Sequence, residues 1–140
     1  MIQLHIGFDD TDSPRMGCTT YVAALLVERL SRLGVSFTDY PSLIRLNPNV
    51  PWKTRGNGAL CLRVRCPEER VDEVMEAVVD TIEENADLGY AGTDPGAVFL
   101  PHRVPPEVQA FARRTIQGVV EMKEALRLVR AFGCEAVGFK

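Results

Sequence analysis

The sequence has no long apolar run, no secretory leader and no closely paired cysteines. Its longest apolar run, 21–27, is far shorter than the roughly 20 residues that span a membrane, and no basic segment followed by an apolar one opens the chain. The four cysteines (Cys18, Cys61, Cys66 and Cys134) include no CxxC pair. These absences argue against a membrane protein, a zinc site and a disulfide framework, and they favour a reducing cytoplasm.

The composition is that of one globular unit with an uneven charge distribution. The chain has 140 residues, of which 46% are hydrophobic and 25% charged, so we expect a single α/β unit over 1–140. The net charge is −3, yet 41–66 holds five basic residues and no acid, whereas 68–94 holds ten acids and one base. The basic segment either meets phosphates, of a nucleotide or of RNA, or faces the acidic segment within the same fold.

The hydrophobic periodicity predicts an α+β fold. Apolar residues alternate with polar ones in strands and recur at helical spacing between them, and Gly34 is a plausible stop for the first helix. The order β-α-β-β-α-β is that of a ferredoxin-like sandwich, here with additional C-terminal helices and an apolar tail that could form another strand. The predicted strands are 2–8, 35–46 (interrupted at Pro41), 60–66 and 97–100, and the predicted helices are 22–33, 67–82, 106–120 and 121–132.

An acidic turn follows the first predicted strand. Asp9, Asp10 and Asp12 lie within four residues, and so many carboxylates repel one another unless a cation sits among them. Mg²⁺ prefers one or two carboxylates together with phosphate oxygens, so a metal–nucleotide site explains the cluster. The alternative is a polar turn in which an aspartate bonds its own backbone.

The start of the first helix, 17–20 (GCTT), lies directly after this turn. A helix N-terminus presents free N–H groups and the positive end of the helix dipole, Gly17 lets the backbone approach closely, and a threonine hydroxyl could bind phosphate or accept a phosphoryl group. The alternative is that Thr19 or Thr20 is simply the N-cap. A Walker-type GxxxxGK[ST] loop is absent, because no lysine precedes the threonines.

Two further segments carry candidate groups. In the loop 47–58, Lys53 and Arg55 could grip phosphate, and the lone Trp52 could stack on a base or cover the edge of the core. Asp94 lies in a turn from which its carboxylate could reach a site at neighbouring strand ends. His5 and His102 have no suitably spaced nucleophile or acid and are interpreted as structural.

Several of these motifs together resemble one family. They are 7–13 (GFDDTDS), 18–21 (CTTY), 43–48 (LIRLNP), 53–59 (KTRGNGA) and 95–99 (PGAVF). The combination resembles the N-terminal catalytic region of the archaeal tRNA(Ile2) 2-agmatinylcytidine synthetases, over essentially the whole chain.

The resemblance implies an ATP- and Mg²⁺-dependent ligase. Enzymes of that family activate the C2 oxygen of the wobble cytidine of tRNA(Ile2) with ATP and attach agmatine there, so that the anticodon reads AUA. Their kinase-like domain has a threonine that becomes phosphorylated during ATP turnover, and by motif it corresponds to Thr19. The implied catalytic residues are Thr19, Asp9 and Asp10, the implied metal ligands are Asp9, Asp10 and Asp12, and the implied ATP- and phosphate-binding residues are Asp12, Ser13, Gly17, Cys18, Thr20, Lys53 and Arg55.

The resemblance covers the kinase-like and ferredoxin-like part of the family. The OB-fold and zinc ribbon with which the family binds tRNA are not in this sequence, so we expect tRNA and agmatine to need the rest of such an enzyme. Two other functions stay open at this stage. One is a non-catalytic ferredoxin-like module that binds RNA or a partner chain through its basic segment, and the other is a phosphohydrolase of the haloacid-dehalogenase type with Asp10-Thr11-Asp12 as its DxD motif.

Overall fold

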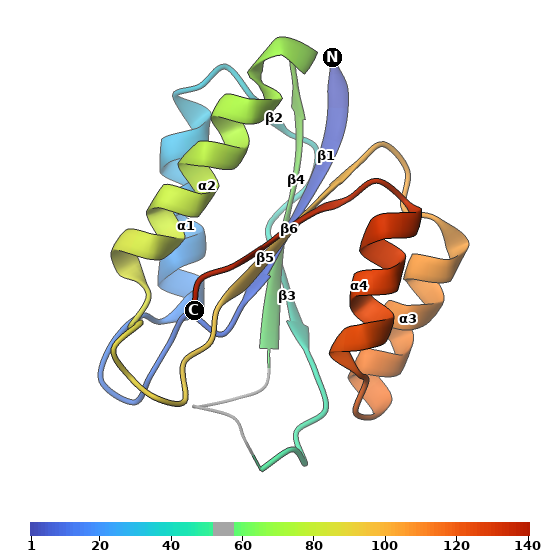
Figure 1. Cartoon of the computed structure of the whole chain (residues 1–140). Helices are drawn as coiled ribbons and strands as arrows, with labels where there is room; N and C mark the ends of the chain where they lie inside the picture. The colour runs from blue at the N-terminus through green and yellow to red at the C-terminus, as the bar shows by residue number, and fades with distance from the viewer. Residues whose placement is uncertain (52–57) are drawn as a thin grey trace.

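The chain folds around one six-stranded sheet with two pairs of helices (Figure 1). The computed structural model describes residues 1–51 and 58–140. The strands are β1 (Ile2–Asp9), β2 (Ser36–Phe37), β3 (Ser42–Arg45), β4 (Gly58–Cys66), β5 (Gly96–Pro101) and β6 (Glu135–Gly138). The helices are α1 (Thr19–Ser31), a 3-10 turn η1 (Glu68–Arg70), α2 (Val71–Asn85), α3 (Pro106–Gln117) and α4 (Met122–Ala131).

The strand order confirms the ferredoxin-like prediction. The sheet runs β2-β4-β1-β5-β6, and β3 pairs β4 further along the same strand, after the interruption that contains Pro41. The predicted apolar tail is a strand, β6, which extends the sheet beyond β5. Every strand pairing among the described residues is antiparallel. A haloacid-dehalogenase motif needs a parallel sheet around it, so the phosphohydrolase alternative does not fit this fold.

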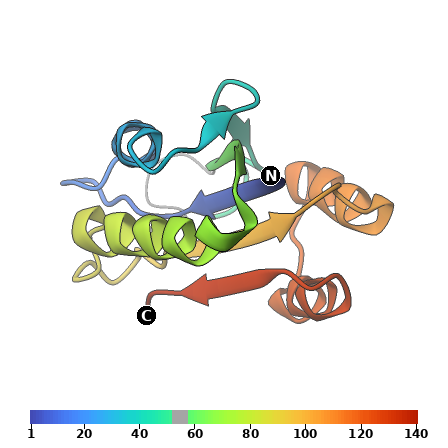
Figure 2. The same cartoon turned by 90° about the horizontal axis from the view of Figure 1, so that it is seen from above.

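Helices α1 and α2 cover one face of the sheet and enclose the core (Figures 1 and 2). The alternation in β1 places Leu4, Ile6 and Phe8 on that face, where each is at most 3% exposed. Side chains of β4, β5, α1 and α2 complete the cluster, and burying this much apolar surface is the main stabilising contribution to the fold. Gly34 ends the α1 segment with a φ of +73°, the left-handed conformation predicted for a C-terminal stop.

Helices α3 and α4 lie on the other side of the sheet, away from α1 and α2 (Figures 1 and 2). They form a hairpin between β5 and β6. In the whole segment 102–140, only Leu128 is buried. Beside this hairpin, the His5 ring lies 3.0 Å from the His102 carbonyl oxygen, which supports a structural role for that histidine.

Among the residues that the structure describes, the ion pairs of the acidic helix α2 are with α1. Within 1–51 and 58–140, Asp80 and Glu84 of the acidic helix α2 are approached by Arg29 of α1 rather than by the basic segment. Arg63 of the basic segment instead lies 3.5 Å from Asp39. No helix in the described part is both long and apolar enough to cross a membrane.

Candidate active site

The candidate site lies at the edge of the sheet where β1 ends. Asp9, the last residue of β1, pairs with Gly96, the first residue of β5, so the loops 10–18 and 86–95 meet there. Backbone groups of the acidic loop are held from the second loop: the Asp87 N–H donates to the Thr11 carbonyl at 3.0 Å, and the Thr93 hydroxyl donates to the Asp12 carbonyl at 2.7 Å. Thr11 and Thr93 are fully buried, so the acidic loop rests on a fixed support.

Three carboxyl groups crowd this edge. Burial, followed by the charges of Asp10 and Asp94, raises the pKa of Asp9 to about 6, although a hydrogen bond from the Gly96 backbone opposes the shift. Asp10 has a φ of +53°, and its carboxylate accepts a hydrogen bond of 3.1 Å from the Asp94 N–H. Asp94, which the sequence placed in a turn with its acid near a strand-end site, is therefore part of the same group.

Helix α1 begins at this loop, and its first residue is Thr19. The N-cap is Cys18, which makes no side-chain capping bond, so the alternative that Thr19 or Thr20 caps the helix is wrong. Instead, the Thr19 hydroxyl oxygen lies 3.0 Å from that of Thr11. The Thr20 hydroxyl is 3.1 Å from the Cys18 sulfur. The first turn of α1 holds no acid, an arrangement that suits an anion near these N–H groups.

Ser13, predicted as a phosphate ligand, is bonded within the two loops of the site. Its side chain is fully buried, and its hydroxyl donates to Asp87 at 2.7 Å and accepts from the backbone N–H groups of Arg15 and Met16. A hydroxyl held in this way shapes the turn, because it cannot reach a ligand without breaking buried hydrogen bonds. Ser13 therefore supports the loop, and its predicted contact with phosphate stays a prediction.

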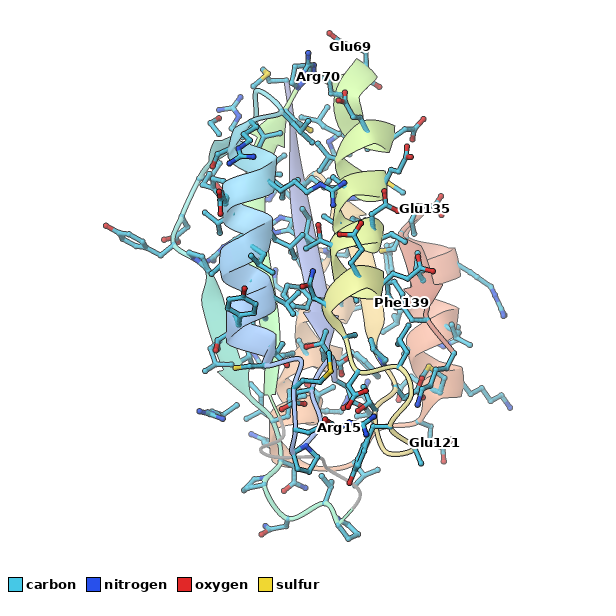
Figure 3. The ribbon with its side chains drawn as sticks, turned by 90° about the vertical axis from the view of Figure 1, so that its left-hand side faces the viewer. Arg15, Glu69, Arg70, Glu121, Glu135 and Phe139 are labelled. Atoms are coloured by element: carbon cyan, nitrogen blue, oxygen red, sulfur yellow. The ribbon has the colours of Figure 1, made fainter. Side chains whose placement is uncertain are left out.

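An ion pair fastens this turn to the segment after α2. The Arg15 guanidinium grips the Asp87 carboxylate with two hydrogen bonds of 2.5 and 2.9 Å (Figure 3 labels Arg15). Only 6% of the Asp87 side chain is exposed, whereas that of Arg15 is 62% exposed. The hydrogen bonds from Arg15 and then Ser13 lower the pKa of Asp87 to about 2. The Arg15–Asp87 clamp is bidentate, the geometry in which arginine holds a carboxylate best.

Gly17 is required by the backbone of the loop. Its φ is +79°, and a Cβ added there would lie 2.4 Å from the Thr11 carbonyl oxygen. Its own carbonyl accepts a hydrogen bond of 2.7 Å from the Thr11 hydroxyl. Gly17 therefore allows the loop to close tightly before α1, while the close approach to phosphate predicted from the sequence stays a prediction.

The remaining predicted residues precede β4 in the sequence. Lys53 and Arg55, the proposed phosphate ligands, lie outside the described residues, as does Trp52. Their predicted roles therefore stay predictions.

The donor set suits a divalent cation bound together with phosphate. Asp9 and Asp10 are adjacent carboxylates whose mutual repulsion a cation would relieve, and Mg²⁺ needs only one or two such ligands when phosphates supply others. Within 1–51 and 58–140, no three His, Cys, Asp or Glu side chains form a ready-made metal cluster. The protein side of such a site would therefore be small, and the predicted set of Asp9, Asp10 and Asp12 is not preassembled.

Sequence reasoning missed the residues that support the acidic loop: Thr11, Arg15, Asp87 and Thr93. A signal was present, because the ferredoxin-like order puts the start of β5 beside the end of β1. Polar residues just before β5 therefore had to lie next to the acidic loop, and Asp87 and Thr93 are two of them.

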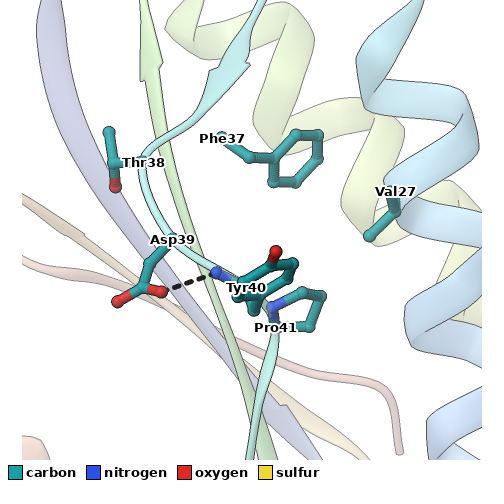
Figure 4. Close-up of a pocket in the computed structure, with 6 residues that line it drawn as sticks. All are labelled: Val27, Phe37, Thr38, Asp39, Tyr40 and Pro41. Atoms are coloured by element: carbon teal, nitrogen blue, oxygen red, sulfur yellow. Dashed lines mark hydrogen bonds between the residues drawn. The ribbon is translucent and has the colours of Figure 1, made fainter.

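A surface groove lies elsewhere on the molecule. It has a volume of about 450 Å³ and runs between α1 and the bend that joins β2 to β3 (Figure 4). Its lining residues are Val27, Phe37, Thr38, Asp39, Tyr40 and Pro41, none of which belongs to the acidic loop. The groove is therefore separate from the candidate site.

The family model described as the TiaS TCKD domain matches residues 5–68, a range that contains β1, the acidic loop and the start of α1. The chain is 45% identical over 137 residues to the tRNA(Ile2) 2-agmatinylcytidine synthetase TiaS of Pyrococcus horikoshii, which covers 98% of this chain and 32% of that relative. It is 37% identical over 140 residues to the TiaS of Thermococcus sibiricus, which covers 100% of this chain and 32% of that relative.

Solved structures of TiaS are also similar to this chain. A TiaS–tRNA(Ile2)–ATP complex superposes with a TM-score of 0.88 at 38% identity, covering 100% of this chain and 33% of that one. A TiaS–tRNA(Ile2)–AMPCPP–agmatine complex gives 0.90 at 35% identity, with the same coverage. The chain therefore corresponds to an N-terminal region of TiaS, and it spans about a third of the length of these relatives.

Proposed function

We propose that this chain is the ATP- and Mg²⁺-binding catalytic module of a ligase that attaches agmatine to the wobble cytidine of tRNA(Ile2). The observation that carries the proposal is the contact between the acidic loop and the start of α1: Thr11, between Asp10 and Asp12 in the chain, lies 3.0 Å from the Thr19 hydroxyl. The matched synthetases carry that name, and structures of their complexes hold ATP or AMPCPP with tRNA(Ile2).

Each group at the site has a role in this proposal. Asp9 and Asp10 hold the cation, with Asp12 nearby, while Gly17, Cys18 and Thr20 shape the helix start that faces phosphate. Lys53 and Arg55 contribute positive charge to the phosphates. A bound Mg²⁺ would neutralise charge on the phosphoryl oxygens. Thr19 accepts the γ-phosphoryl group during ATP turnover, as in the family that the motifs resemble.

The wider setting follows from the same proposal. The substrates are tRNA(Ile2) and agmatine, and the module works with the remainder of a TiaS-length enzyme, since the relatives are about three times as long. All four cysteines are free thiols, which suits a reducing cytoplasm, where tRNA is modified.

The direct test is incubation with γ-labelled ATP and Mg²⁺, with the labelled residue located by mass spectrometry. We expect label on Thr19, no label in Thr19→Val, and undiminished label in the control Thr38→Val, an exposed threonine in the groove away from the acidic loop. A salt-dependent affinity for RNA with no ATP turnover would contradict the proposal and favour the RNA-binding module instead.

The metal role has its own test. Mg²⁺ with ATP should raise the melting temperature of the wild type, and Asp9→Asn should reduce that rise, because the variant removes a carboxylate ligand and keeps the shape of the side chain. An equal rise in melting temperature in both proteins would show that Asp9 is not a metal ligand.

A further inference from the structure

The hydroxyl of Thr11 has a defined direction. Its side chain is fully buried, and its oxygen lies 2.7 Å from the Gly17 carbonyl oxygen and 3.0 Å from the Thr19 hydroxyl oxygen. A carbonyl can only accept, so the single Thr11 proton goes to Gly17. The Thr11 oxygen is then left to accept the proton of Thr19.

This arrangement is held from several sides without any ligand. The Thr11 carbonyl accepts from the Asp87 N–H at 3.0 Å, and the next residue, Asp12, is held through its carbonyl by Thr93 at 2.7 Å. Gly17 packs so closely on the Thr11 carbonyl that no side chain fits between them. Thr11 is therefore a fixed acceptor against which the half-buried Thr19 can be oriented.

We propose that Thr11 is a positioning residue that holds the Thr19 hydroxyl in one rotamer with its proton turned inward, so that an oxygen lone pair faces the phosphoryl donor. The inference rests on the proposed function. In that reaction the bond from the Thr19 oxygen to the γ-phosphorus forms, the bond from that phosphorus to the departing ADP breaks, and the Thr19 proton is released to water. In a loose phosphoryl-transfer transition state the attacking hydroxyl loses its proton late. The rate therefore depends more on the direction of the oxygen lone pair than on a strong base.

The chain offers a matched control for the test. Thr93 is also fully buried, and its hydroxyl also donates to a backbone carbonyl of the acidic loop. That carbonyl belongs to Asp12, so this bond does not involve Thr19. Thr11→Val and Thr93→Val therefore both remove one buried hydroxyl-to-backbone bond, and Thr11→Val alone removes the acceptor for Thr19. Thr11→Ser keeps that acceptor.

The first readout uses the 140-residue chain without ATP. Three-bond couplings to the Thr19 methyl carbon, measured by NMR, report its side-chain rotamer. We expect a single rotamer in the wild type, Thr11→Ser and Thr93→Val, and rotamer averaging in Thr11→Val. A single unchanged rotamer in Thr11→Val would overturn the inference even if Thr19 is phosphorylated as proposed.

The second readout is the rate at which label from γ-labelled ATP appears on Thr19. Relative to Thr93→Val, Thr11→Val should lower the maximal rate about tenfold or more, while the ATP concentration for half-maximal rate changes less than about twofold. Equal rates in the two valine variants would overturn the inference and leave the proposed function intact, whereas absence of label on Thr19 in the wild type would overturn both. If Thr11→Val does not fold, Thr11→Cys against Thr11→Ser makes the same comparison, because sulfur is a weak acceptor.

Discussion

The carboxyl group of Asp9 is placed where ionisation is costly. It is largely removed from water at the end of a central strand, and Asp10 and Asp94 carry charges of the same sign next to it. The result is a pKa of about 6, well above the value of about 4 in an unfolded chain. A bound cation would relieve the repulsion among these carboxylates, so the site favours cation binding.

This titration has a predictable effect on stability. Because the folded-state pKa of Asp9 is raised, the folded protein binds the proton more tightly than the unfolded chain, so stability falls as pH rises from about 4 through about 6. The shift corresponds to at most about 3 kcal/mol. Melting temperatures of wild type and Asp9→Asn, measured without divalent cations, should therefore diverge in favour of the variant between about pH 4 and pH 7. A constant difference across that range would show that Asp9 ionises normally.

Gly17 supports a second prediction at the level of a single residue. Gly17→Ala should lower the free energy of unfolding by about 2 kcal/mol or more, since the new Cβ would lie 2.4 Å from a backbone oxygen at a positive φ. Gly118→Ala is the control, because a Cβ there meets nothing within 4 Å. Urea denaturation measures both, and equal midpoints would contradict the tight closure of the loop.

At the scale of elements, the acidic loop depends on the segment between α2 and β5. The Arg15–Asp87 clamp and the buried hydroxyl of Ser13 attach one side of the loop, and Thr93 attaches the other. The groups that would meet phosphate are thus positioned by a part of the chain more than 70 residues away in sequence. Rigid support of this kind is what a preorganised site requires.

The Arg15–Asp87 clamp should be visible in a pH titration with the opposite sign to that of Asp9. Because the pKa of Asp87 is lowered to about 2, its contribution to stability is present above about pH 4 and is lost as pH falls toward 2. The difference in melting temperature between wild type and Asp87→Asn should therefore be largest near neutral pH and shrink in acid.

Amide hydrogen exchange gives the corresponding structural measurement. Amides of the loop 10–17 should exchange faster in Asp87→Asn than in wild type. The control is Glu28→Gln, which breaks an exposed ion pair with Arg32 that is worth only about 0.5 kcal/mol. Faster exchange of 10–17 in the control as well would mean that a general loss of stability, and not the clamp, explains the effect.

At the scale of the whole molecule, the two faces of the sheet differ in how much they bury. The face under α1 and α2 carries the hydrophobic core. In the hairpin of α3 and α4 on the other side, only Leu128 is buried. Several large apolar side chains of the hairpin stay exposed: Ile116, Val119, Met122 and Leu126. The layer of α1 and α2 therefore buries much apolar surface. The layer of α3 and α4 buries little and is called the weak layer below.

The weak layer should open first. In hydrogen exchange on the 140-residue chain, amides of α3 and α4 should exchange well before those of α1 and α2, because local opening of the hairpin exposes little apolar surface. Val119→Ala should leave the melting temperature nearly unchanged, since Val119 is 65% exposed, whereas Ile82→Ala in the core should cost about 2–5 kcal/mol. Simultaneous exchange of all four helices would contradict this division.

How much of this could be predicted from the sequence depended on whether a feature is periodic. The alternation in β1 and β4 and the stripe of α2 identified the core face and the ferredoxin-like order, because burial repeats with the period of each element. The acidic strand end was predicted from the local spacing of its aspartates, and Thr19 was singled out by the family resemblance. The buried contact of Ser13 could not be predicted, since its partner Asp87 is 74 positions away and no local pattern reveals such a contact. Thr11 was overlooked although its hydroxyl partners Gly17 and Thr19 are near in sequence, because only the folded turn brings the three together.

The left-handed backbone at Asp10 narrows the choice of side chains that this position tolerates. Besides glycine, aspartate and asparagine are the residues that adopt such a conformation most readily. Replacement by asparagine therefore removes the charge and leaves the turn intact, whereas alanine changes charge and backbone together. An alanine scan of the acidic loop will therefore overstate the electrostatic importance of Asp10, because part of the measured loss will come from the backbone.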